Sequence, residues 1–231
     1  MRRVGLHTIP LMSDRKTVLG VDVGGSHVKL LISEGEPERR RFESGDDLGP
    51  EKMVKKSVEL AEGWAYDVVS VGIPAPVRED RVVAEPVNLG TGWVGFDLQQ
   101  AFGKPTKVIN DAAMQALGSY EGGTMLFLGL GTGLGSALVI GGVVQPMELA
   151  HLPFRKETFE DYVGERGRDR LGKKKWRAAV LETIERLSAA LQVDYVVLGG
   201  GNVKYMNELP DNVRLGGNEN AFRGAFRLWD S

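Results

Sequence analysis

Glycines gather at three points in this sequence of 231 residues, each time directly after an apolar run. The clusters are Gly24-Gly25 followed by Ser26, Gly131-Thr132-Gly133, and Gly199-Gly200-Gly201. Glycine lets backbone N–H groups come close to a ligand, which a phosphate or another oxyanion requires. A tight turn also needs glycine, so each cluster alone is compatible with a plain turn. Three clusters at strand ends favour contact with a phosphate or nucleotide.

A carboxylate, Asp22, lies two residues before the first glycine pair. Beside a phosphate it would repel the ligand unless a cation lay between them, and Mg²⁺, held directly or through water, is the natural cation. Ser26 can donate a hydrogen bond to a phosphate oxygen. Lys29 adds a positive charge if its side chain points toward the ligand. We therefore expect Asp22 to act on magnesium, and Ser26 and Lys29 to act on the phosphates.

Two well-known phosphate motifs do not fit this chain. The dinucleotide fingerprint G-x-G-x-x-G is not met, because Leu134 and Ser136 stand where its third glycine is required. Residues 167–173 have P-loop spacing, but Lys174 replaces the Ser or Thr that would hold magnesium, and no apolar strand precedes them. We interpret that match as accidental.

Asp111 follows the apolar run 105–110 and begins the helical pattern 111–120. A carboxylate in this place can take the proton of a hydroxyl group that attacks phosphorus. The same position suits an aspartate that only caps the helix. The residues by themselves leave both roles open.

Short apolar runs alternate with amphipathic stretches, which indicates an α/β fold. We expect strands at 17–23, 26–32, 67–74, 105–110, 124–130, 135–141 and 194–201, and helices at 50–63, 96–102, 111–120, 173–191 and 218–229. Each half opens with a strand, a glycine-rich turn and another strand, so two related lobes are predicted. Their expected extents are a flexible leader 1–16, an N-terminal lobe of 17–112 with the closing helix 218–231, and a C-terminal lobe of 113–217.

The composition excludes several classes of protein. With 29 Lys and Arg against 31 Asp and Glu, the net charge of −2 gives no global basic field for nucleic acid or an anionic membrane. The absence of cysteine excludes a disulfide scaffold and a thiolate metal site, and fits a reducing compartment. Glycines interrupt the longest apolar stretch, which argues against a membrane span. We expect a cytoplasmic globular protein.

Seven segments follow one another along the chain: VDVGGSHVKL, VGIPAPV, VNLGTGWVGFDL, VINDAAMQALGSYEGG, LGLGTGLGSALVIGG, MELAH and VVLGGGN. Their content and order resemble the ROK family of sugar kinases, over about residues 17 to 229. The resemblance implies a two-lobed actin-like (ribonuclease H-like) ATPase fold of the hexokinase/ROK type. The short chain and the segment VNLGTGWVGFDL look most like the polyphosphate/ATP glucokinase branch.

The resemblance also implies roles for the candidate residues. Asp111 would be the catalytic base, and the glycine clusters with Asp22 would face ATP or polyphosphate and Mg²⁺, the third cluster lying against the adenosine. The side chains expected to hold the sugar are Asn88, Asn110, Asp111, Glu148, His151 and Glu160. The implied reaction phosphorylates the 6-hydroxyl of a hexose, first of all glucose, with N-acetylmannosamine, fructose or allose as alternatives. A homodimer is expected.

Two alanines, Ala75 and Ala150, replace glycines of the family pattern. If the glycine needs positive φ, alanine would cost about 1 kcal/mol there. A sugar-binding protein without turnover is therefore a rival interpretation. The family's zinc-binding cysteines are missing, which excludes structural zinc. Seven basic residues from Arg166 to Arg177 predict either a solvated helix face or a surface that contacts polyphosphate or another copy in an oligomer.

Overall fold

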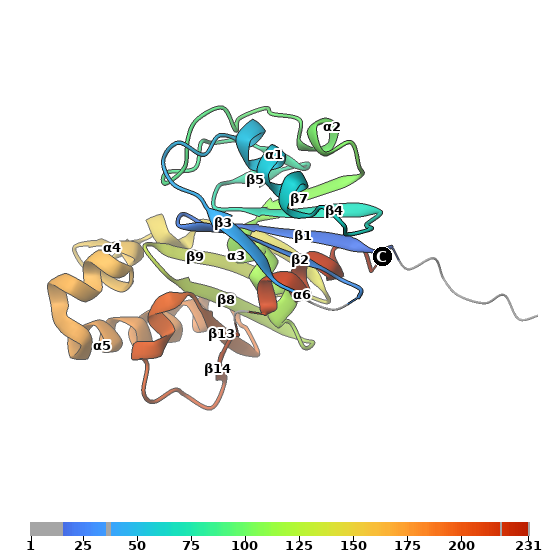
Figure 1. Ribbon diagram of the computed structural model, residues 1–231. Coiled ribbons are helices and arrows are strands. Elements are labelled where there is room, and N and C mark those ends of the chain that lie inside the picture. The colour runs from blue at the N-terminus through green and yellow to red at the C-terminus, as the bar shows by residue number, and fades with distance from the viewer. Residues whose placement is uncertain (1–15, 36–37, 218, 231) are drawn as a thin grey trace, which may run out of the picture.

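The computed structural model describes residues 16–35, 38–217 and 219–230. The predicted leader, residues 1–16, lies outside these ranges apart from Lys16. Two five-stranded sheets lie with two helices between them (Figure 1). The strand order is β3-β2-β1-β4-β7 in the first sheet and β10-β9-β8-β13-β14 in the second.

The first sheet combines an antiparallel meander with parallel strands. Its members are β1 (Val18–Val23), β2 (His27–Ile32), β3 (Arg40–Glu43), β4 (Val68–Ile73) and β7 (Thr106–Asn110). β1 and β4 are buried at every residue, as expected for parallel strands covered on both faces. The helices α1 (Pro50–Leu60) and α2 (Leu98–Phe102) cover the outer face (Figure 1). A small hairpin, β5 (Val77–Arg78) and β6 (Arg81–Val82), precedes α2.

The second sheet repeats this plan. It contains β8 (Thr124–Leu130), β9 (Leu134–Ile140), β10 (Val143–Met147), β13 (Tyr195–Gly199) and β14 (Val213–Leu215). The long helix α5 (Glu165–Leu191) packs its stripe of Trp176, Val180, Ile184 and Leu187 against this sheet. Gly172, at φ 73°, breaks the helical geometry, so the regular part begins at the predicted residue 173. Shorter elements link these parts: η1 (Leu149–His151), β11 (Pro153–Phe154), β12 (Glu157–Thr158), α4 (Phe159–Val163) and η2 (Gly201–Tyr205).

The helices α3 (Asp111–Ser119) and α6 (Asn220–Arg227) form the layer between the sheets (Figure 1). Alanines of α3 pack on Met125 and Phe127 of the second sheet. α6 packs on the first sheet, where a Cβ on Gly20 would lie 3.0 Å from Phe222. The two helices touch through glycines, since a Cβ on Gly224 would lie 1.8 Å from the Met114 carbonyl oxygen. Both sheets are thus fixed to one central pair of helices.

The predicted strands and helices are all present, with ends shifted by a few residues. Several short elements were not predicted, namely β3, β5, β6, β11, β12, β14 and α4. β3 reads Arg-Arg-Phe-Glu and half of it is exposed, so it lacks an apolar run. The P-loop-like residues 167–173 lie within α5, which agrees with an accidental match. The lobe boundaries stay a prediction. Within the described part of the chain, no helix is long and apolar enough to cross a membrane.

Candidate active site

Strand β7 ends at Asn110 and helix α3 begins at Asp111, so both side chains stand where the first sheet meets the central helices. Asn110 caps the helix: its Oδ1 accepts hydrogen bonds from the backbone N–H groups of Ala112 at 3.0 Å and Ala113 at 3.2 Å. Its Nδ2 donates to the carbonyl oxygen of Ala75 at 3.3 Å. The cap that the sequence allowed at Asp111 therefore belongs to Asn110.

Asp111 keeps one carboxylate oxygen available. Its Oδ1 accepts the N–H of Ala112 at 2.8 Å, while no donor among the described residues pairs with Oδ2. The residue has some surface exposure, but protein encloses the carboxyl group. This burial, together with the charges of Asp22 and Glu148, raises its pKa from 3.8 to about 6. A base with a pKa close to neutral pH is well matched to proton transfer.

Asp22 and Lys29 face each other across β1 and β2. The Lys29 Nζ lies 3.3 Å from Asp22 Oδ2, and the two side chains are 40% and 12% exposed. Lys29, expected on a phosphate, is thus paired with the carboxylate expected on magnesium. The described residues contain no group of three or more acidic or histidine ligands for a metal. The single carboxylate fits Mg²⁺ nevertheless, because this ion commonly takes one or two carboxylates and completes its shell with phosphate oxygens and water.

The first glycine loop joins β1 to β2. Two of its carbonyl groups are held by Ser44, whose Oγ donates to Gly24 at 2.7 Å and whose N–H donates to Ser26 at 3.1 Å. Gly24 and Gly25 do not have positive φ, and only Gly24 is tightly enclosed, since a Cβ there would lie 3.1 Å from the His27 carbonyl oxygen. A Cβ on Gly25 would lie 3.4 Å from the Asn88 Cβ. The structure thus brings the predicted sugar residue Asn88 beside the predicted phosphate loop.

The second turn, residues 131–133, joins β8 to β9 and is held in the same way. The amide of Asn202 donates to the carbonyl of Gly131 at 2.9 Å, and the N–H of Glu165 donates to that of Thr132 at 3.1 Å. Glu160 Oε2 accepts the N–H of Leu134 at 3.2 Å. A Cβ on Gly133 would lie 2.1 Å from that oxygen, so a larger residue there would displace the Glu160 carboxylate.

The third cluster, residues 199–201, lies beside the end of β8. Gly200 has φ 84°, and a Cβ there would lie 2.4 Å from the Leu130 carbonyl oxygen, so glycine is required for both conformation and space. Gly199 pairs with Gly129 across the parallel strands β13 and β8. The second and third clusters therefore meet at one edge of the second sheet, as the prediction of a shared donor site requires.

The remaining predicted sugar residues differ in their surroundings. Glu148 and His151 are exposed, with 3.8 Å between Oε2 and Nε2. The charge of Glu148 contributes to the raised pKa of Asp111. Glu160 lies against the second glycine turn instead. Contact of any of these side chains with a sugar stays a prediction.

The two alanines of the family departures cause no backbone strain. Ala75 and Ala150 are buried, and neither has positive φ. The condition under which alanine would cost stability is therefore not met. Ala75 also supplies the carbonyl group that binds Asn110.

The basic run is not one solvated face. The Arg168 side chain is 14% exposed and pairs with Glu165 at 2.9 Å and Asp169 at 2.8 Å. It also donates to Asn202 Oδ1. Three cations surround the ring of Tyr205, namely Arg168, Lys173 and Lys204.

The sequence did not single out Asn202, Ser44 or Tyr205, although Asn202 directly follows the third glycine cluster.

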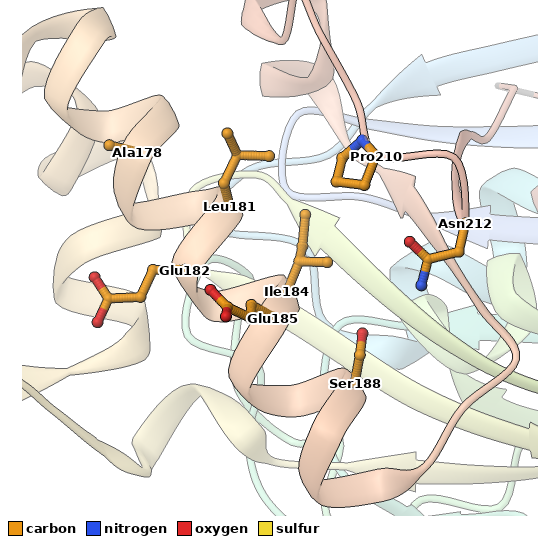
Figure 2. Close-up of a pocket in the computed structure, with 8 residues that line it drawn as sticks. All are labelled: Ala178, Leu181, Glu182, Ile184, Glu185, Ser188, Pro210 and Asn212. Carbon is orange, nitrogen blue, oxygen red and sulfur yellow. The ribbon is translucent and has the colours of Figure 1, made fainter.

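A cavity of about 640 Å³ lies elsewhere, between the second half of α5 and residues 210–212 (Figure 2). Its lining residues are Ala178, Leu181, Glu182, Ile184, Glu185, Ser188, Pro210 and Asn212. No predicted donor or sugar residue is among them, so this cavity is separate from the candidate active site.

Comparison with known proteins identifies the family. The model of the ROK family matches residues 18–146, which is more than half of the chain. This chain belongs to the ROK family. The resemblance read from the seven sequence segments is therefore confirmed.

Individual relatives are distant. The polyphosphate glucokinase of Mycobacterium tuberculosis is 24% identical over 203 residues, which cover 79% of this chain and 76% of that enzyme. The bifunctional enzyme NanE/NanK of Brucella melitensis is 28% identical over 138 residues, which cover 54% of this chain but 27% of that enzyme. The chain thus spans about a quarter of that larger relative.

The fold has close counterparts among solved structures. The inorganic polyphosphate/ATP-glucomannokinase from Arthrobacter sp. strain KM superposes with a TM-score of 0.78 at 24% identity, over 93% of this chain and 98% of that one. The protein therefore has the predicted two-lobed, actin-like fold of the ROK sugar kinases.

Proposed function

We propose that this ROK-family protein transfers a phosphoryl group from ATP or polyphosphate to the 6-hydroxyl of a hexose, with glucose as the first candidate. A phosphotransferase acting on a sugar hydroxyl follows from the family and from the kinases among its relatives. The observation that carries the finer proposal is Asp111, an enclosed carboxylate with a pKa of about 6, which the charges of Asp22 and Glu148 help to raise. One of its oxygens has no hydrogen-bond donor among the described residues.

In this mechanism Asp111 Oδ2 accepts the proton of the sugar's 6-hydroxyl. The hydroxyl oxygen forms a bond to the terminal phosphorus, and the bond from that phosphorus to the bridging oxygen of the donor breaks. The electron pair of the broken bond stays on the shortened donor. Asp111 later releases its proton to water. The capping bonds of Asn110 fix the start of α3 and so hold Asp111 in place.

Residues of both sheets face the donor in this proposal. Gly24, Gly25 and Ser26 contact its terminal phosphates from the first sheet, and Gly131 to Gly133 do so from the second. Magnesium, bound by Asp22, would offset the negative charge of the phosphates. The turn at Gly199–Gly201 lies against the adenosine when ATP is the donor.

The sugar side rests on Asn88, Asn110, Glu148, His151 and Glu160. Hydroxyl groups that leave water need new donors and acceptors, which carboxylate, amide and imidazole groups supply. The glucokinase and glucomannokinase among the relatives support glucose. Another hexose is the alternative within the same mechanism. A homodimer belongs to the proposal as well, and light scattering of the purified protein tests it.

A coupled assay of the purified protein with a panel of hexoses, run in parallel with ATP and with polyphosphate, tests the proposal. Glucose should be the best acceptor, and Asp111→Asn should lower turnover by about 10²–10⁴-fold. The exposed Asp211, changed to Asn, is the matched control and should keep full activity. Phosphorylation of no hexose, or half of the turnover retained by Asp111→Asn, would contradict the proposal.

A further inference from the structure

We propose that Ser44 and Asn202 are positioning residues for the phosphoryl donor. Each donates a hydrogen bond to a carbonyl oxygen of one glycine turn. This bond orients the next backbone N–H of that turn toward the phosphates. This inference rests on the proposed function for the identity of the ligand. Ser44 and Asn202 lie outside the glycine motifs, and they fix the direction of backbone N–H groups that the glycines alone cannot fix.

The argument begins with the geometry of the peptide bond. A trans peptide is planar, so its C=O and its N–H point in opposite directions. A donor bound to the carbonyl of residue 24 therefore turns the N–H of Gly25 away from that donor. A donor on the carbonyl of residue 131 does the same to the N–H of Thr132. Fixing one end of each peptide fixes the direction of the other.

Ser44 performs this task in the first turn. Its hydroxyl donates to the Gly24 carbonyl at 2.7 Å, and its own N–H donates to the Ser26 carbonyl at 3.1 Å. The two bonds hold the loop on both sides of Gly25. Within the described part of the chain, the N–H of Gly25 has no acceptor. It is therefore free to bind a ligand.

Asn202 performs the task in the second turn. It is 5% exposed, and its Nδ2 donates to the Gly131 carbonyl at 2.9 Å. Arg168 can only donate, so its bond to Asn202 Oδ1 determines which end of the amide faces the turn. The guanidinium group is itself held by Glu165 and Asp169. Asn202 thus has one orientation, as a donor to the turn.

Glu165 completes this support from the backbone. Its N–H donates to the Thr132 carbonyl at 3.1 Å, which turns the N–H of Gly133 outward as well. In the described residues neither Thr132 nor Gly133 has an acceptor for its N–H. Two adjacent N–H groups with fixed directions are the concave donor arrangement that binds anions.

Loss of either support should weaken donor binding selectively. Without its partner, a glycine-flanked peptide can rotate and present its carbonyl oxygen to a phosphate, which repels it. A hydrogen bond to a charged group contributes enough that losing one N–H should raise the KM for the donor by about 10- to 100-fold. The KM for the sugar should stay within about twofold, because the supports do not touch the predicted sugar residues.

The variants Ser44→Ala and Asn202→Ala test this, with Ser57→Ala and Asn220→Ala as controls. Ser57 and Asn220 are buried and hydrogen-bonded, but they bind Met53 and Ser119 instead of a glycine turn. Both pairs should lose similar thermal stability. Only the first pair should lose affinity for ATP and for inorganic tripolyphosphate, measured by titration calorimetry without sugar.

Two further variants separate positioning from folding. Ser44→Thr keeps the hydroxyl and should restore donor affinity. Asn202→Asp keeps the acceptor for Arg168 but sets a carboxylate oxygen against the Gly131 carbonyl, so donor affinity should stay low in a folded protein. Unchanged donor affinity in Ser44→Ala and Asn202→Asp would overturn the inference. If no sugar is phosphorylated, the calorimetry still tests whether Ser44 and Asn202 position the donor. A wild-type protein that binds neither ATP nor tripolyphosphate would overturn both this inference and the proposed kinase function.

Discussion

Replacing Asp111 with asparagine should stabilise the folded protein at neutral pH while it removes turnover. Burial and the nearby charges of Asp22 and Glu148 raise the pKa of this carboxyl from 3.8 to about 6. One pKa unit corresponds to about 1.4 kcal/mol. The ionised Asp111 therefore costs the folded state up to about 3 kcal/mol at pH 7, a cost that the neutral amide avoids.

The sign of the pH dependence follows from proton binding by Asp111. Between pH 3.8 and about 6 the folded protein binds more protons than the unfolded chain. The contribution of this group to stability consequently falls as pH rises through that interval and is most unfavourable above it. Asparagine does not titrate. The stability advantage of Asp111→Asn should be greatest near neutral pH and should be small near pH 4.

Thermal unfolding of both proteins at about pH 7 and about pH 4 measures this effect. For a chain of this size, 1 kcal/mol shifts Tm by about 2–4 °C, so the variant should melt up to about 6–12 °C higher at neutral pH. The amide oxygen can still accept the N–H of Ala112, so the start of α3 should be preserved. The Asp211→Asn control should show no such difference. A Tm difference that is the same at both pH values, or a destabilised variant at neutral pH, would refute the reasoning.

Three other substitutions test separate parts of the molecule. Asp22→Ala should lower turnover and weaken the apparent affinity for Mg²⁺, and an unchanged magnesium titration would leave Asp22 only as the partner of Lys29. Replacing Lys173, Lys174 and Lys175 by Ala should raise the KM for polyphosphate and leave the KM for ATP unchanged. In the wild type, activity with polyphosphate should fall more steeply with added salt than activity with ATP. Equal salt slopes for the two donors would contradict this prediction. Gly224→Ala would place a Cβ 1.8 Å from the Met114 carbonyl oxygen, so it should cost about 1–3 kcal/mol in urea unfolding, and an unchanged midpoint would show that the two helices move apart freely.

The sequence by itself determined the elements, the fold class and the family. Apolar periodicity depends on local geometry, so the stripe on α5 and the buried runs of β1 and β4 were readable without any partner. The order of the glycine-rich segments then pointed to the ROK family. Only short or charged elements such as β3 were not predicted, because they bury too few side chains to produce an apolar pattern in the sequence.

The tertiary structure alone decided how the candidate site is held together. It gave the helix cap to Asn110 and left Asp111 available, with a raised pKa that depends on charges from other elements. It also separated Arg168 from the other basic residues between Arg166 and Arg177, because the Arg168 side chain is largely enclosed and bonds to Asn202. Ser44 bonds to a residue 20 positions away and Asn202 to one 71 positions away. Such contacts form only when the chain brings distant segments together, so no local pattern of residues records them.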